Sequence, residues 1–352
     1  MIKLVLFEDT NELADSLIAA IKQIVPPNGD VIRFDAPADG DGNIYEDRLV
    51  ATLSKPPYMD ASLIIADRDL SKTPGFSGLA EPTVRRVAHT LAIPECTYAR
   101  TMNESEFLRA AEQRESCIAV SIEDEEKCAA QIIAIAQGFA DIRERLSQLQ
   151  TGPRRSPGRL LADVLGKPEY ADKISLYASG DQNRLASVLR PRGEGNYEKL
   201  NRLTCLLGYW LWDSVLRYPG VIVNDVAASS YLNIHVDTFL HEADVSGVFE
   251  AARYAGPFEL ARGPLWWRGM LDDMVAAEDC VDGRAFVVKR LSKHVLRSEC
   301  CEDHDQQAGY YCMLSNQPVS LKNSKGGLPW FPRGADLARV STSQYDELGP
   351  WL

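Results

Sequence analysis

The stretch ASLIIAD at residues 61–67 is a nearly all-apolar run that ends in a carboxylate. Such a run is typical of a strand that is buried on both faces of a parallel sheet. Four further strand-like runs occur at residues 2–7, 30–35, 93–99 and 117–122. The N-terminal part of the chain is therefore expected to contain five strands, with residues 61–67 as the third.

Apolar residues with helical spacing lie between and after these runs. We expect helices at residues 11–25, 44–54, 80–91 and 104–113, and a long helix at about 124–149. Strands that alternate with helices form a parallel sheet covered on both faces, because each crossover is right-handed. The pattern predicts an α/β fold with a flavodoxin-like, doubly wound sheet of five parallel strands.

The pattern changes after a segment rich in proline, glycine and arginine, TGPRRSPGR at residues 151–159. This composition is typical of a linker. We therefore place a first domain at residues 1–149 and a linker at 150–159. Residues 160–352 are expected to form a mainly α-helical C-terminal domain, for which no family is evident.

The chain is acidic, with 352 residues and a formal net charge of −12. Residues 1–150 carry about −10 of this charge, which disfavours nucleic acid as the main partner because phosphate backbones are repelled. No run of 18 apolar residues is present, and the N-terminus lacks the features of a signal peptide. We expect a cytoplasmic protein that does not bind membranes.

Three carboxylates follow two of the predicted strands. Glu8 and Asp9 come after the first strand, and Asp67 ends the third. In a doubly wound sheet, ligands bind at the carboxyl ends of the strands. Carboxylate oxygens suit Mg²⁺, and an aspartate beside such an ion can attack a phosphoryl donor.

This arrangement resembles the receiver domain of two-component response regulators, over residues 1 to about 148. The family has an acidic pair after the first strand and a phosphate-accepting aspartate after the third. Here the matching residues are Glu8-Asp9 and the motif Asp67-Arg68-Asp69-Leu70-Ser71. The resemblance implies that Asp67 accepts phosphate and that Glu8, Asp9 and Asp67 bind Mg²⁺. It also implies that the backbone carbonyl of Asp69 completes the protein's share of the ligands.

Two further family positions match less closely. The family places a Ser or Thr after the fourth strand, where Thr101 fits best and Thr97 is the alternative. It also places a Lys at the end of the fifth strand, where this chain has Ser121. That Lys supplies a point charge to the phosphoryl group. Its absence leaves open a pseudo-receiver that docks partners without a phosphorylation switch.

Two motifs in the C-terminal region suggest other functions. Residues 225–242 have the pattern of a helix-turn-helix, but the second helix contains no Arg or Lys to face phosphates. A zinc site would need four ligands, and the candidates are Cys300, Cys301, His304 and Cys312. Zinc is not favoured, because adjacent cysteines rarely point at one metal ion.

The sequence thus favours a signalling or regulatory protein in which the first domain controls the C-terminal domain. The expected partner is a histidine kinase or another signalling or effector protein, and a homodimer is compatible with this role. Regulation is favoured over catalysis. The alternatives are a DNA-binding transcription regulator and an effector enzyme with its active site in the C-terminal domain.

Overall fold

The structure of the protein is a computed structural model. It describes residues 2–27, 29–35, 45–70, 79–99, 118–121, 124–149, 155–178 and 195–348. The chain divides into two compact units. The first comprises Met1–Thr151 with Leu189–Trp210, and the second comprises Gly152–Val188 with Leu211–Leu352.

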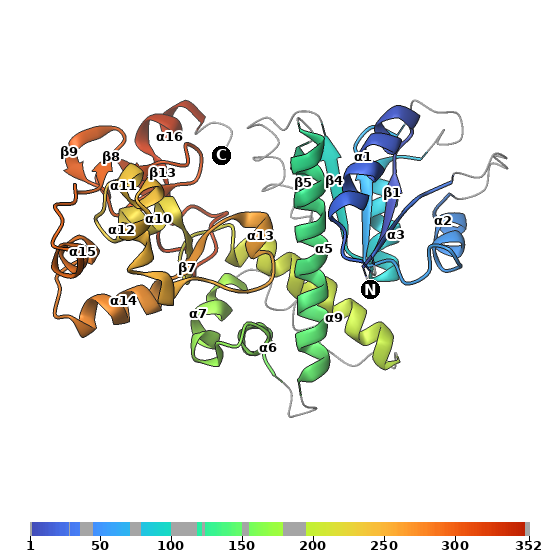
Figure 1. Ribbon diagram of the computed structural model, residues 1–352, viewed down its shortest axis with the longest axis horizontal. Helices are drawn as coiled ribbons and strands as arrows, with labels where there is room; N and C mark the ends of the chain where they lie inside the picture. The colour runs from blue at the N-terminus through green and yellow to red at the C-terminus, as the bar shows by residue number, and fades with distance from the viewer. Residues whose placement is uncertain are drawn as a thin grey trace. The chain divides into compact units, whose positions relative to one another are not determined.

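Five strands of the first unit form one sheet in which every neighbouring pair is parallel (Figure 1). Their order is β2-β1-β3-β4-β5. The strands are β1 (Lys3–Phe7), β2 (Asp30–Arg33), β3 (Leu63–Asp67), β4 (Glu95–Ala99) and β5 (Ile118–Ser121). Each lies within a predicted run, so the prediction of a five-stranded parallel sheet is confirmed.

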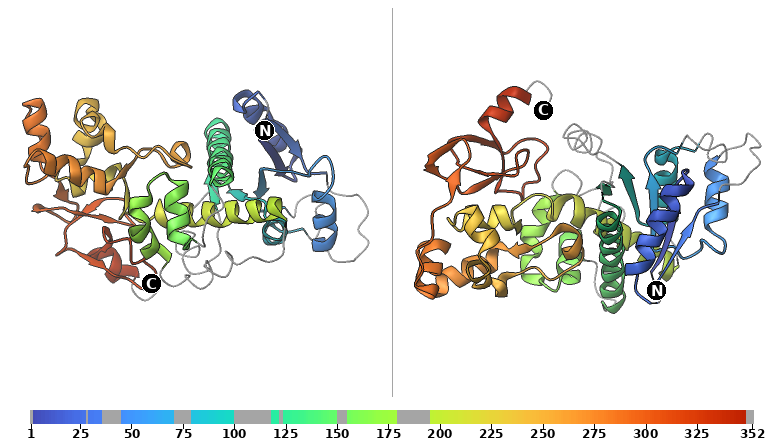
Figure 2. Two further views of the ribbon diagram at one scale, coloured as in Figure 1. Left: turned by 90° about the horizontal axis from the view of Figure 1, so that it is seen from below. Right: turned by 45° about the horizontal axis from the view of Figure 1, so that its top comes forward.

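Helices cover both faces of this sheet (Figure 2). They are α1 (Asn11–Ile24), α2 (Tyr45–Leu53), α3 (Glu81–Leu91) and α5 (Glu125–Gln148). The predicted helix at 104–113 lies outside the described residues. Helix α1 packs on α5, and α2 packs on α3. Because side chains alternate along a strand, odd and even positions of β1 face different helices.

One face of the sheet is identified by its core. Val5 on β1 and Ile64 on β3 belong to a buried cluster with side chains of α2 and α3. Leu4 and Leu63, their neighbours in sequence, are also fully buried. By alternation they point to the opposite face, which α1 and α5 cover. The two faces are called below the α2/α3 face and the α1/α5 face.

Helix α9 (Asn196–Trp210) belongs to the first unit, although its residues follow the predicted linker. It packs on α5, where the ring of Phe139 lies so close to Gly208 that a Cβ atom there would be 2.2 Å from it. The hydroxyl of Tyr209 accepts a hydrogen bond from the backbone N–H of Glu95 at 2.7 Å and lies 3.0 Å from the Glu95 carbonyl oxygen. The helix is thereby fixed to the start of β4.

The second unit begins with helices and ends with small sheets. Its helices are α6 (Pro157–Val164), α7 (Ala171–Ser175), α10 (Asp225–Tyr231), α11 (Val236–His241), α12 (Ala243–Gly247), α13 (Glu259–Arg262), α14 (Arg268–Ala277), α15 (Gly283–Leu291) and α16 (Thr342–Leu348). Its strands are β6 (Ile222–Asn224), β7 (Leu265–Trp267), β8 (Glu299–Cys300), β9 (Asp303–Gln307), β10 (Tyr310–Cys312), β11 (Pro318–Val319), β12 (Ser324–Gly326) and β13 (Ala338–Ser341).

Most of the second unit up to α15 is helical, in agreement with the sequence. The strands from β8 onward were not predicted. Strands β11, β10, β13 and β12 form one small sheet in that order, and β6-β7 and β8-β9 form two-stranded sheets. These strands have two to five residues, too few for an alternating pattern to stand out. In the described part of the chain, no helix is both long and apolar enough to cross a membrane.

Candidate metal centre

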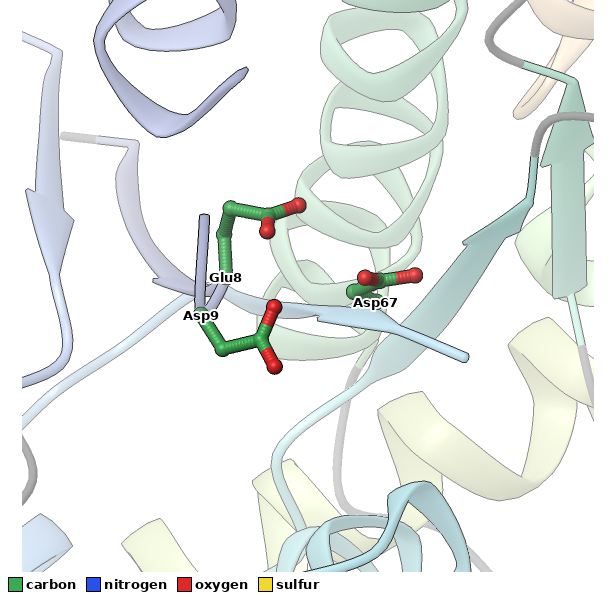
Figure 3. Close-up of side chains that lie close together, drawn as sticks. All are labelled: Glu8, Asp9 and Asp67. Atoms are coloured by element: carbon green, nitrogen blue, oxygen red, sulfur yellow. The ribbon is translucent and has the colours of Figure 1, made fainter. Parts of the chain in front are cut away.

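The ends of β1 and β3 bring Glu8, Asp9 and Asp67 together (Figure 3). Strands β1 and β3 are neighbours, with Phe7 beside Ala66 in the register. Glu8 and Asp67, one residue further along, therefore meet at the carboxyl edge of the sheet. One carboxylate oxygen from each of the three residues lies within 4.8 Å of the other two. This is the cluster that the sequence predicted.

Two of these carboxylates are buried. Glu8 is 0% exposed and Asp9 is 3% exposed, whereas Asp67 is partly exposed. The backbone N–H of Thr10 donates to Oε1 of Glu8 at 2.6 Å, and the Thr10 hydroxyl donates to Oδ1 of Asp9 at 3.3 Å. The turn after β1 thus holds both acidic side chains in place.

The residues present fit a divalent cation. Like charges this close repel one another, and the repulsion is stronger where burial lowers the local dielectric constant. A bound cation becomes the largest local charge and relieves that repulsion. The cluster offers only oxygen ligands, as Mg²⁺ prefers, and three protein ligands leave the other positions of an octahedral ion to waters, several of which Mg²⁺ usually keeps.

Tyr98 lies beside the acidic cluster, although the sequence did not single it out. It pairs with Asp67 in the register of β3 and β4, and it is 1% exposed. Its hydroxyl donates a hydrogen bond to Oε2 of Glu8. Burial, together with the adjacent charge of Glu8, raises the pKa of Tyr98 far above its ordinary value, so the phenol remains a hydrogen-bond donor.

The other predicted site positions are placed as follows. Thr101 lies outside the described residues. Asp69 is exposed, and its backbone N–H donates to Oδ1 of Asp67 at 3.3 Å. Ser121 is the last residue of β5 and pairs with Ala99. The alternative Thr97 does not reach the cluster through its hydroxyl, which contacts acidic side chains on the α2/α3 face instead.

Thr97 and the acidic side chains that it contacts form a second group, which also includes an arginine. We call this group the Thr97 network; its members are Glu81, Arg85, Glu95 and Thr97. Oγ1 of Thr97 lies 3.0 Å from Oε1 of Glu81 and 2.7 Å from Oε1 of Glu95. Arg85 forms a salt bridge with Glu81, and its Nε lies 3.9 Å from Oε2 of Glu95. A hydroxyl has one hydrogen to donate, so it satisfies one carboxylate only. The second contact requires a proton on a carboxyl group.

Of the two acids, Glu95 is the one whose burial favours the protonated form. Its side chain is 0% exposed, and burial raises its pKa from 4.5 to about 7, against the lowering effects of the Thr97 hydrogen bond and the charge of Arg85. Protonation of Glu95 removes one of two neighbouring negative charges, since the charge of Glu81 also raises the pKa of Glu95. The Thr97 network therefore compensates its buried charge with Arg85 and a proton.

The zinc candidates do not gather in the same way. Glu8, Asp9 and Asp67 form the one group in the described ranges in which three potential ligand atoms lie within 4.8 Å of one another. Sγ of Cys312 lies 3.0 Å from Oε1 of Gln344, and Nδ1 of His304 lies 3.5 Å from Oε2 of Glu299. Cys300, Cys301, His304 and Cys312 thus form no such cluster.

The helix-turn-helix candidate forms two short helices, α10 and α11, that contact each other. Asn233 between them has a φ of 58°, which suits a tight turn. The exposed positions of α11 are Asp237, Leu240 and His241. Phosphate contacts need cations, so this surface offers little to a nucleic acid.

No family model matches the chain, and no curated protein matches it.

Proposed function

We propose that the first unit is a receiver-like signalling module, in which Glu8, Asp9 and Asp67 hold Mg²⁺ and Asp67 accepts a phosphoryl group. The observation that carries this proposal is the meeting of the three carboxylates at the carboxyl edge of the sheet. The strand order β2-β1-β3-β4-β5 is that of the flavodoxin-like folds, which bind ligands at this edge. Receiver domains share that fold.

The chemistry is a phosphoryl transfer to a carboxylate. An oxygen of Asp67 attacks the phosphorus atom of a phosphohistidine or an acyl phosphate. The new O–P bond forms while the bond from phosphorus to the donor breaks, and the donor leaves with the electron pair. Bound Mg²⁺ would neutralise charge on the phosphoryl oxygens. Glu8 and Asp9 would bind this ion and orient it beside Asp67. Asp67 is partly exposed, as a residue that meets a phosphoryl donor must be.

The proposed output is protein docking with little switching. A phosphoryl group on Asp67 adds negative charge beside Glu8 and Asp9. A Lys at the end of β5 would contribute a charge-assisted bond of about 1.5–3 kcal/mol, whereas a neutral donor contributes nearer 1 kcal/mol. Ser121 offers only the neutral kind. The proposed partner is a histidine kinase or another signalling protein, and the second unit is the proposed output or scaffold.

Incubation of the full chain with acetyl phosphate and Mg²⁺, followed by intact mass spectrometry, tests the proposal. One phosphoryl group per chain is expected, removable by hydroxylamine as an acyl phosphate should be. It should be absent with EDTA and absent in Asp67→Asn. Asp60→Asn is the matched control, because Asp60 is an exposed acid of the same unit, hydrogen-bonded to Tyr197.

Two outcomes are informative beyond the adduct itself. An adduct that persists in Asp67→Asn would contradict the assignment of the phosphoacceptor. An adduct on Asp67 that greatly changes oligomeric state or partner affinity would show that Ser121 does not disable the switch.

A further inference from the structure

We infer that Tyr98 is the positioning residue of the cation site, because its phenol fixes the carboxylate of Glu8 in the orientation that faces Asp9 and Asp67. This inference rests on the proposed cation site of the first unit. It assigns a role to a residue outside the three carboxylates, which come from β1 and β3, and it makes β4 the third strand that shapes the site.

The geometry shows how the carboxylate is held. Oε1 of Glu8 accepts the backbone N–H of Thr10 at 2.6 Å, and Oε2 accepts the hydroxyl of Tyr98. Each oxygen has its own donor, and the two donors belong to different elements: one to the turn after β1 and one to β4. A carboxylate with one donor on each oxygen cannot rotate about its last bond without breaking a hydrogen bond.

The position of Tyr98 in the sheet explains why its phenol reaches Glu8. Tyr98 pairs with Asp67 across β3 and β4, and β3 lies between β4 and β1. The side chain is 1% exposed, and its hydroxyl bonds to Glu8 just after β1. It therefore passes over the end of β3.

A phenylalanine at this position would keep the packing and remove the donor. Oε2 of Glu8 would then lose the hydrogen bond from Tyr98 at a site where Glu8 is 0% exposed. Hydrogen bonds from outside the ligand set orient metal ligands, and their loss typically weakens binding about 10-fold to 100-fold. A carboxylate oxygen has lone pairs for both a hydrogen bond and a cation, so the phenol need not leave when the ion binds.

The chain offers a matched control in Tyr58. Its phenol is also buried, at 6% exposure, and its hydroxyl accepts the backbone N–H of Asp35 at 3.0 Å. Tyr58 belongs to the buried cluster on the α2/α3 face, whereas Tyr98, paired with Asp67, lies on the other face of the sheet. Tyr58→Phe therefore removes a buried hydroxyl from the same unit without touching the cation site.

Isothermal titration calorimetry with Mg²⁺ on the full chain is the test, with the unfolding temperature of each cation-free variant measured alongside. Tyr98→Phe is expected to weaken Mg²⁺ binding about 10-fold or more, whereas Tyr58→Phe should bind within twofold of the wild type. A second measurement uses Tb³⁺ in the wild-type protein. Excitation of tyrosine should produce Tb³⁺ emission that Mg²⁺ displaces, since the phenol lies beside the site.

The outcomes separate this inference from the proposed function. Equal Mg²⁺ affinity in Tyr98→Phe and the wild type, or tighter binding in the variant, would overturn the role of Tyr98 and leave the cation site standing. No Mg²⁺ binding in the wild type would overturn the cation site itself. If Tyr98→Phe does not fold, the absence of tyrosine-excited Tb³⁺ emission from the wild type would overturn the inference.

Discussion

The two faces of the parallel sheet each bury acidic side chains, but they differ in what compensates the charge. On the α1/α5 face and at the carboxyl edge, Glu8 and Asp9 lie with Asp67 beside a phenol. On the α2/α3 face, Glu81 and Glu95 share the hydroxyl of Thr97 beside Arg85. Residues of the same type in the same unit thus occupy two different electrostatic environments.

Burial of a carboxylate does not by itself identify a metal site. Glu8 and Glu95 are both 0% exposed. Glu95 lies beside the Thr97 hydroxyl and the Arg85 guanidinium, and burial raises its pKa to about 7. The Glu8 cluster has three carboxylates whose oxygens converge within 4.8 Å at the edge of the sheet. Carboxylate oxygens that converge at the edge of a sheet suit a cation, whereas burial of a carboxyl group inside the core favours its protonated form.

The largest effect is expected for Glu95→Gln, which should change how the stability of the protein depends on pH. In the folded protein the pKa of Glu95 is about 7, against 4.5 for its ordinary value. Between these pH values the folded state binds more protons than the unfolded state. The contribution of Glu95 to the free energy of unfolding therefore falls as the pH rises from 4.5 to 7, and it is constant above pH 7. The difference in pKa corresponds to roughly 3 kcal/mol.

Glutamine keeps the size of a neutral glutamic acid and an oxygen that can accept from Thr97, and it does not titrate. Glu95→Gln should therefore match the wild type near pH 4.5 and be more stable by roughly 3 kcal/mol above pH 7. Hydrogen exchange of β3 and β4 amides, compared between the two proteins at the same pH, measures this. A variant less stable than the wild type above pH 7 would contradict a raised pKa of Glu95 in the folded protein.

A smaller effect is expected at Thr97, the hydroxyl shared by the two acids. Thr97→Val keeps the shape of the side chain and removes the hydroxyl, which leaves buried carboxyl groups without that partner. The expected cost is about 2 kcal/mol. Thr97→Ser keeps the hydroxyl and is the matched control. Equal stability of the two variants by the same exchange measurement would show that the hydroxyl contributes little.

The sequence predicted much of the first unit because its signals there are local. The apolar runs predicted the strands, and the helical spacing of apolar residues predicted the helices. The predicted ends of β1 and β3 agree with the structure to the residue. Glu8, Asp9 and Asp67 then followed from the rule that parallel strands end at one edge.

What the sequence could not show depends on contacts between distant residues. The role of Tyr98 requires the register of β3 and β4, in which it pairs with Asp67. The return of α9 to the first unit depends on Tyr209 reaching the backbone of Glu95. Neither contact leaves a pattern in the segment that makes it. The strands after β8 were missed because they are short and have no alternation of polar and apolar residues.

The most direct test of the central claim compares two glutamates that are equally buried. Mg²⁺ is titrated by calorimetry into the wild type, Glu8→Gln and Glu95→Gln, with circular dichroism to confirm that each is folded. One Mg²⁺ per chain is expected in the wild type and in Glu95→Gln, and none at the same concentrations in Glu8→Gln. Undiminished binding in Glu8→Gln, or loss of binding in Glu95→Gln, would contradict the assignment of the cation to the edge of β1 and β3.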